Sequence, residues 1–335
     1  MISKKIINYL IGLTLIILFS PLLSFGQDIP SSSNFLQIKI TPEKPEPLQN
    51  VTVSIVSYVY DLDRARITWS VNNVEKRNEI GLKEFSFQVG KSGQEMTIKA
   101  TADVKNEGLK EAEISFTPAV VDVIYEAKAY TPPFYKGRAL NPNQGTILVN
   151  AIPELIKSTG EKVSNQNIIF SWKKDGKVMQ SASGLGKSFF SFDGTVPIRD
   201  YLIEVSVSSL EGGVSAYKQT TIKNIFPKII FYENSPVYGI MFNKAIVNIV
   251  KMLSDEFSVI AIPYFYSVGY INSGDLDYVW TMNGLQVGNQ APKNSFTTRV
   301  DAPGAGSAEI GLKISNNARI FQFVQNNYQL SFEKQ

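Results

Sequence analysis

Two acidic pairs have the residue types and spacing that could help to hold a metal ion. Asp61 and Asp63 stand two positions apart, and Asp275 and Asp277 repeat that spacing, each pair just ahead of a tryptophan. Calcium needs six or more oxygen ligands, and two carboxylates supply only part of that shell. The four residues are therefore weak calcium candidates. The alternative is that they are ordinary acids of loops and strand starts.

The composition excludes most other site chemistry. The 335-residue chain contains no histidine and no cysteine. Without imidazole or thiolate it can build neither the usual zinc sites nor a Ser-His-Asp or Cys-His nucleophile system, and it cannot form a disulfide. Its 30 acidic residues leave carboxylate chemistry open, but no motif places two of them across a cleft. We expect no enzyme activity and no cofactor.

The stretch SASGLGKS at 181–188 ends in Gly-Lys-Ser, as a phosphate-binding loop does. Such a loop also needs a glycine five positions before Gly186, where Ser181 stands, and it leads from a strand into a helix. Here the aromatic stretch FFSF follows. We expect no nucleotide site.

The stretch AYTPPFYKGRAL at 129–140 is the densest group of aromatic, proline and basic residues in the chain. One interpretation is an exposed aromatic-cationic surface for a glycan or a partner protein, and the other is a domain junction. In the second, the prolines mark an edge segment, because proline removes a ladder donor, and the aromatics pack at the junction with the first domain. The candidate residues for either role are Tyr130, Phe134, Tyr135, Lys136 and Arg138.

A second stretch occupies the same position in the next repeat and favours the junction. Residues 125–140 read YEAKAYTPPFYKGRAL and residues 232–246 read YENSPVYGIMFNKAI. Both open with Tyr-Glu, pass a proline and an aromatic residue, and close on a basic residue, alanine and an aliphatic residue. A position that recurs indicates architecture before recognition.

Residues 1–26 are predicted to be a signal peptide, because the two lysines of MISKK precede an uncharged apolar run and small residues precede Gln27. The alternative is an uncleaved anchor, since the run is about long enough to span a bilayer. Either way we expect an exported protein, which is extracellular, on the cell surface or periplasmic. The 33 basic and 30 acidic residues give a net charge of +3 without blocks of one sign. We therefore expect no nucleic-acid partner, and membrane contact only through an uncleaved leader.

Three stretches that contain the three tryptophans predict the fold. ARITWSVNNVE (65–75), IIFSWKKDGKV (168–178) and LDYVWTMNGLQV (276–287) each alternate apolar and polar residues and end in an Asn/Asp/Gly turn. Trp69, Trp172 and Trp280 lie 103 and 108 residues apart, about one β-sandwich each. All three lie on the apolar face of their strand, so we assign them to cores. The chain is predicted to be all-β, with sandwich domains at 34–120, 121–225 and 226–335.

The strand–Trp–turn unit, followed by strands such as DYLIEVSVSS (200–209), resembles immunoglobulin-like and PKD-like repeats of exported bacterial surface proteins. The chain also resembles exported proteins of candidate-phylum bacteria. It departs from true immunoglobulin domains because it lacks their cysteine pair. The resemblance implies a non-enzymatic protein of the cell envelope or surface that acts in adhesion, spacing or assembly. The alternative hypothesis is a carbohydrate-binding or carbohydrate-processing protein. Its partner would be a protein or a glycan at the envelope.

Overall fold

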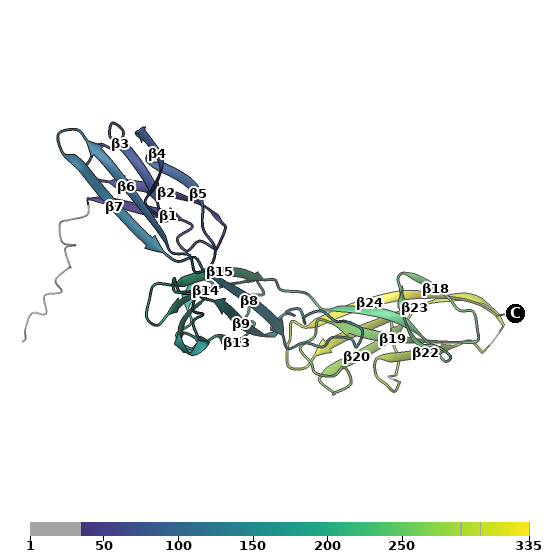
Figure 1. The fold of residues 1–335 in the computed structure, drawn as a ribbon. Helices are drawn as coiled ribbons and strands as arrows, with labels where there is room; N and C mark the ends of the chain where they lie inside the picture. The colour runs from purple at the N-terminus through teal and green to yellow at the C-terminus, as the bar shows by residue number, and fades with distance from the viewer. Residues whose placement is uncertain (1–34, 289, 302, 335) are drawn as a thin grey trace, which may run out of the picture. The chain divides into compact units, whose positions relative to one another are not determined.

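The computed structural model describes residues 35–288, 290–301 and 303–334, and these residues form an all-β chain of sheets (Figure 1). The predicted signal peptide at 1–26 lies outside the described residues. Within the described part, no helix is long and apolar enough to cross a membrane. The strands group into three tandem β-sandwich modules, each with two sheets: of three and four strands in the first, three and five in the second, and four and five in the third. The predicted fold class is therefore confirmed, while the predicted domain boundaries stay predictions.

The first module contains strands β1 to β7. One sheet has the order β1-β2-β5 and the other has the order β4-β3-β6-β7. The strands are β1 (Leu36–Thr41), β2 (Asn50–Ser57), β3 (Arg66–Val71), β4 (Val74–Ile80), β5 (Glu84–Gln88), β6 (Met96–Val104) and β7 (Gly108–Phe116).

The second module contains strands β8 to β15. The order β13-β9-β8 forms one sheet, and β11-β10-β14-β15 with the short β12 forms the other. The strands are β8 (Val120–Ala127), β9 (Thr146–Glu154), β10 (Ile168–Lys174), β11 (Lys177–Val178), β12 (Gly184–Leu185), β13 (Phe189–Asp193), β14 (Tyr201–Ser209) and β15 (Ser215–Ile222). Two single-turn 3₁₀ helices, η1 (Asn165–Asn167) and η2 (Gln180–Ala182), connect them.

The third module repeats this plan and adds β17 and β18. Its sheets have the orders β17-β16-β19-β22 and β18-β24-β23-β20-β21, and β18 pairs with β24 in parallel. The strands are β16 (Lys228–Ser235), β17 (Gly239–Ile246), β18 (Ile249–Lys251), β19 (Glu256–Tyr264), β20 (Leu276–Met282), β21 (Leu285–Gln286), β22 (Ser295–Arg299), β23 (Gly304–Asn316) and β24 (Phe323–Lys334).

Contacts divide the described chain into two compact units. Residues 54–85 and 98–114 belong to one unit, together with the residues before 40. Residues 40–53, 86–97 and 115–334 belong to the other, which holds the second and third modules whole. The joint between those two modules therefore lies inside one compact unit.

Each tryptophan makes the same two contacts in its own module. Trp69, Trp172 and Trp280 are fully buried. Each indole Nε1 donates a hydrogen bond of 2.9 Å to a backbone carbonyl two residues before an edge strand of the opposite sheet, which is β5, β13 or β22. Each ring also packs on a phenylalanine of that strand, with centroids 4.8–6.2 Å apart. Burial of so large a ring contributes about 2–3 kcal/mol, and the hydrogen bond satisfies its polar atom.

The turn after each tryptophan strand is a two-residue hairpin. Its central residues are Asn72-Asn73, Asp175-Gly176 and Asn283-Gly284, and all six have φ between 49° and 79°. Two consecutive positive φ values define the type I′ turn, whose twist matches that of the flanking strands. The predicted tight turns are confirmed.

Candidate functional site: a module joint and an open sheet face

The stretch 129–140 connects β8 to β9 and packs on the third module. The amide of Tyr130 donates a hydrogen bond of 2.9 Å to the carbonyl of Tyr266, and the Tyr130 ring lies against the third module's core. This burial raises the pKa of the Tyr130 phenol. The ring of Phe134 lies 4.6 Å from that of Phe242 on β17. The expectation that these aromatics pack at the junction with the first domain is wrong, because the stretch extends away from β8 toward the next module.

The rest of the stretch folds back on the second module. The Tyr135 hydroxyl donates to the carbonyl of Arg138 at 3.0 Å. The Arg138 guanidinium lies 3.9 Å from the ring centroid of Tyr125 and also donates to its hydroxyl at 2.7 Å. Lys136 is exposed, and Phe134 and Tyr135 keep about half of their surface. The stretch therefore joins two modules and still presents an aromatic-cationic surface.

A buried network of side-chain amides lies beside this stretch. Gln322 is fully buried, and its Nε2 donates to the backbone carbonyl of Asn143 in the second module and to the hydroxyl of Ser267 at 2.8 Å. Its Oε1 accepts from the Ser267 amide at 2.9 Å and from Asn316 Nδ2 at 2.8 Å. Four hydrogen bonds thus satisfy the whole Gln322 amide without water. Buried amides are expensive when unpaired, so this network favours the closed joint.

Further bonds cross the same joint. Asn143 Nδ2 donates to the carbonyl of Phe321 at 2.8 Å, and the Phe321 amide donates to Gln144 Oε1 at 3.0 Å. Arg319 forms an ion pair of 3.7 Å with Asp193 on β13. The sequence predicted a junction at 129–140, but it did not predict these amide bonds. Their only local signal is the density of Asn and Gln in NPNQ (141–144) and in NNARIFQ (316–322).

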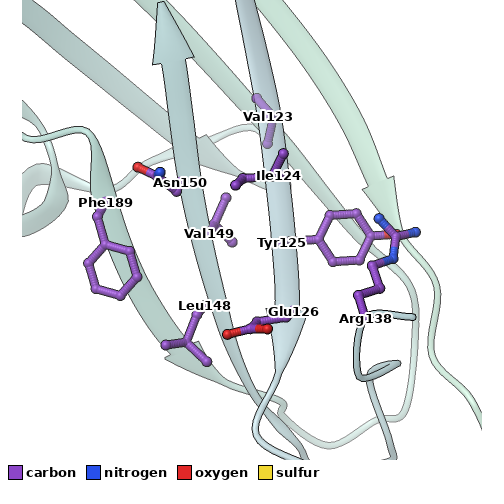
Figure 2. A pocket seen from close by; sticks show the side chains of 9 residues that line it. All are labelled: Val123, Ile124, Tyr125, Glu126, Arg138, Leu148, Val149, Asn150 and Phe189. Carbon is purple, nitrogen blue, oxygen red and sulfur yellow. The ribbon is translucent and has the colours of Figure 1, made fainter. Parts of the chain in front are cut away.

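A shallow hollow lies on the second module's β13-β9-β8 sheet (Figure 2). Its volume is about 600 Å³. Ile124, Asn150 and Phe189 form one row across the three strands, because the register pairs Ile124 with Asn150 and Asn150 with Phe189. Ile124 is 53% exposed and Phe189 is 52% exposed. Adjacent exposed apolar side chains on one sheet face are typical of a surface that contacts a ligand or another protein.

Charged and polar groups surround the apolar row of the hollow. Glu126 lies on β8 beside Leu148 of β9, and the Tyr125–Arg138 pair forms the other rim (Figure 2). The hollow thus offers a carboxylate, a guanidinium and the Asn150 amide around exposed hydrocarbon. These groups can orient a polar ligand while the apolar row supplies contact area. The sequence analysis named Arg138 but missed the other members, because only strand register brings them together.

The acidic pairs do not combine into a larger site. Asp63 forms an ion pair of 2.8 Å with Lys83, and Asp61 lies 3.7 Å from Arg64. Asp275 accepts a hydrogen bond from the hydroxyl of Ser273. Asp277 is an exposed residue of β20. In the residues that the structure describes, no three acidic side chains gather as a metal site would require.

The stretch SASGLGKS supports the tryptophan of the second module. Lys187 uses its Nζ to bind the carbonyl of Ser181 at 2.8 Å, and its own carbonyl accepts from the Trp172 indole. Gly184 and Gly186 have positive φ, and strand β13 follows instead of a helix. The lysine that would meet a phosphate in a nucleotide site is therefore bonded to its own loop.

Comparison with known proteins finds distant structural matches to chains of tandem β-sandwich modules. No protein-family model matches the chain, and no curated protein matches it. Among solved structures, the fibronectin(III)-like modules of Clostridium thermocellum CbhA match 56% of this chain and 93% of that chain, with 12% identity and a TM-score of 0.26. Three N-terminal domains of the highly immunogenic outer capsid protein of bacteriophage RB49 match 90% of this chain and 99% of that chain, with 13% identity and a TM-score of 0.24.

A third match is a Bacteroides ovatus protein, SGBP-B of a mixed-linkage glucan utilization locus, solved with a mixed-linkage heptasaccharide. It covers 88% of this chain and 70% of that chain, with 11% identity and a TM-score of 0.20. At TM-scores this low, none of these matches bears on what the chain does.

Proposed function

We propose that the chain is a non-enzymatic exported protein of the cell envelope or surface that spaces and assembles other components. The observation that carries the proposal is the buried Gln322 amide, which bonds across the joint to Asn143. A flexible linker leaves its polar groups in water, whereas opening this joint would break the bonds from Gln322 to Asn143 and from Asn143 to Phe321 and would expose a fully buried side chain. Closed joints of this kind set the distance between modules, and distance is what a spacing protein supplies.

The open sheet face of the second module is the proposed contact surface for a partner protein. It has exposed hydrocarbon at Ile124 and Phe189, and Glu126 and Arg138 stand at its border to select a partner by charge. Interfaces with an apolar centre and a polar border have this composition. The absence of histidine and cysteine from the sequence fits a binding role better than a catalytic one.

Spin labels test the joint, and the cysteine-free sequence makes labelling clean. The exposed residues Val178 and Leu285 would be replaced by Val178→Cys and Leu285→Cys, labelled, and the distance distribution between them measured by pulsed electron resonance. We expect one narrow distribution that broadens with Gln322→Ala. The exposed Gln290, which bonds only within the third module, provides the control Gln290→Ala. A broad distribution in the unaltered joint would contradict the spacing role.

Cross-linking in the native envelope tests the contact surface. A photoreactive residue at Ile124 should capture a discrete envelope protein, and the same residue at Val178 should not. Equal capture at both positions, or recovery of the chain in the cytoplasm, would sink the proposal.

A glycan ligand is the second candidate function, and the composition of the hollow favours it. A half-exposed ring at Phe189 stands near the carboxylate of Glu126 and the amide of Asn150, and sugars use such combinations of an apolar face and planar polar groups. On a glycan array we expect binding that Phe189→Ala removes. Ile152, exposed on β9 but outside the hollow, gives the control Ile152→Ala. An array on which the exported chain binds nothing excludes this candidate. The stretch 129–140 no longer supports it, because Tyr130 and Phe134 pack on the third module.

A further inference from the structure

The joint between the second and third modules follows a simple rule. The connection after the first strand of one module meets two loops of the next. Those are the loop between β19 and β20, which holds Tyr266, and the loop between β23 and β24, which holds Phe321. Tyr130 bonds to the first of these loops and Asn143 to the second.

In the connections around β1 and β15, the connection after β1 meets one loop of the second module, and the loop after β5 meets the other. Pro45, between β1 and β2, lines one hollow with Gly213, between β14 and β15. Gly93, in the loop after β5, donates its amide to the carbonyl of Pro118, and a Cβ at Gly93 would lie 2.7 Å from Ile156 in the loop after β9. Both joints therefore bring together the same two ends of successive modules.

One end of each kind is left without a counterpart among the described residues. In the third module, the connections between β16 and β19 expose Tyr238 (79%) and Leu253 (91%), and Pro236 and Leu253 line one hollow of about 550 Å³. In the first module, the loop between β2 and β3 exposes Tyr58 (93%) and Val59. The connections between β16 and β19 correspond in strand order to the connection between β8 and β9, and the loop between β2 and β3 corresponds to the loop between β19 and β20. Both of these ends expose large apolar side chains.

We propose that the chain associates end to end: the third module's end, with Tyr238 and Leu253, binds the first module's end, with Tyr58 and Val59, in a second copy. The inference rests on the assembly role proposed above and names its partner. The contact joins two different surfaces, so it is heterologous, and each copy that binds leaves one end of each kind for a further copy. We expect weak association, with a dissociation constant between about 1 µM and about 1 mM.

Sedimentation of the full-length exported chain tests the association. The weight-average mass should rise with concentration through this range and pass the dimer without a plateau. Tyr238→Ser and Tyr58→Ser should each weaken association by roughly tenfold, as expected for central apolar contacts. Val178→Ser, which alters an exposed apolar residue at neither end, should leave it unchanged. A monomer at all concentrations would overturn the inference, as would a mass that stops at the dimer.

Cross-linking identifies the two surfaces, because any introduced cysteine is the only one in its chain. Chains carrying Tyr58→Cys and Tyr238→Cys would be mixed, one of them with a mass tag, and gently oxidised. Mixed dimers should exceed self-dimers, and replacing either partner by a Val178→Cys chain should reduce their yield by about tenfold. Equal yields in all mixtures would refute end-to-end contact. Capture of an envelope protein at Ile124 does not depend on either result, so the proposed function and this inference can fail separately.

Discussion

Replacing Gln322 by leucine is the sharpest test of the joint, since the two side chains differ little in size and differ in polarity. Gln322 is fully buried and makes four side-chain hydrogen bonds. Gln322→Leu leaves the Asn143 carbonyl, the Ser267 amide and the Asn316 side chain without this partner. An unsatisfied buried group costs about 1–3 kcal/mol, and the added apolar burial offsets about 1–2 kcal/mol. The net loss should be about 3 kcal/mol.

Hydrogen exchange read by mass spectrometry separates the modules without added probes. A loss of about 3 kcal/mol lowers the protection of the third module's slowest amides by about 100-fold. Only the Asn143 carbonyl belongs to the second module, so protection there should fall by about tenfold or less. The first module should not change.

The control is Gln290→Leu, because Gln290 is exposed and both of its side-chain bonds go to Thr297. It should cost under about 0.5 kcal/mol. If Gln322→Leu leaves protection within about twofold of the unaltered chain, the network does not stabilise the joint and the reasoning is wrong.

Three further outcomes follow from the fold. Trp172→Phe should destabilise the second module by about 2–4 kcal/mol through lost ring burial and an unpaired carbonyl, and calorimetry should find similar losses for the other two tryptophans. In the type I′ turns, Asn73→Gly should stabilise by about 0.5–1 kcal/mol and Gly176→Ala should destabilise by about 1 kcal/mol in urea melts, and opposite signs would contradict the turn assignment. Burial raises the pKa of the Tyr266 and Tyr328 phenols. The stability that this gives is complete below about pH 10, the unfolded pKa, and is lost as pH rises through the folded values. The phenolate signals of Tyr266 and Tyr328, followed residue by residue by NMR on labelled tyrosine, should therefore appear together with loss of the third module's circular dichroism. Phenolate at either residue in an intact module would refute the burial argument.

The strands and turns could be predicted because their signals are local. Apolar alternation around Trp69, Trp172 and Trp280 indicates one buried face, and the Asn/Asp/Gly pairs specify two-residue turns. The strand predicted at 200–209 is present as β14.

The joint and the hollow could not be predicted, because their members are distant in sequence. Asn143 bonds to Phe321, which lies 178 residues away. The residues next to an asparagine in a loop do not indicate whether its side chain is buried or exposed. Phe189 joins Asn150 only through the register of β13 on β9. Recurrence of the Tyr-Glu stretch indicated a junction, but the neighbour of that junction depends on the direction in which the chain leaves β8.

By itself, the sequence determined the classes of chemistry that are absent, the all-β class, the three tryptophan cores and the tight turns, because composition and short-range period act within a few residues. The tertiary structure alone decided that the aromatic stretch at 129–140 packs on the third module. It also decided that side-chain amides fill that joint and that the sheet face beside Arg138 is open. These depend on which surfaces meet, and the energy of a buried amide is set by the partner that long-range packing brings to it.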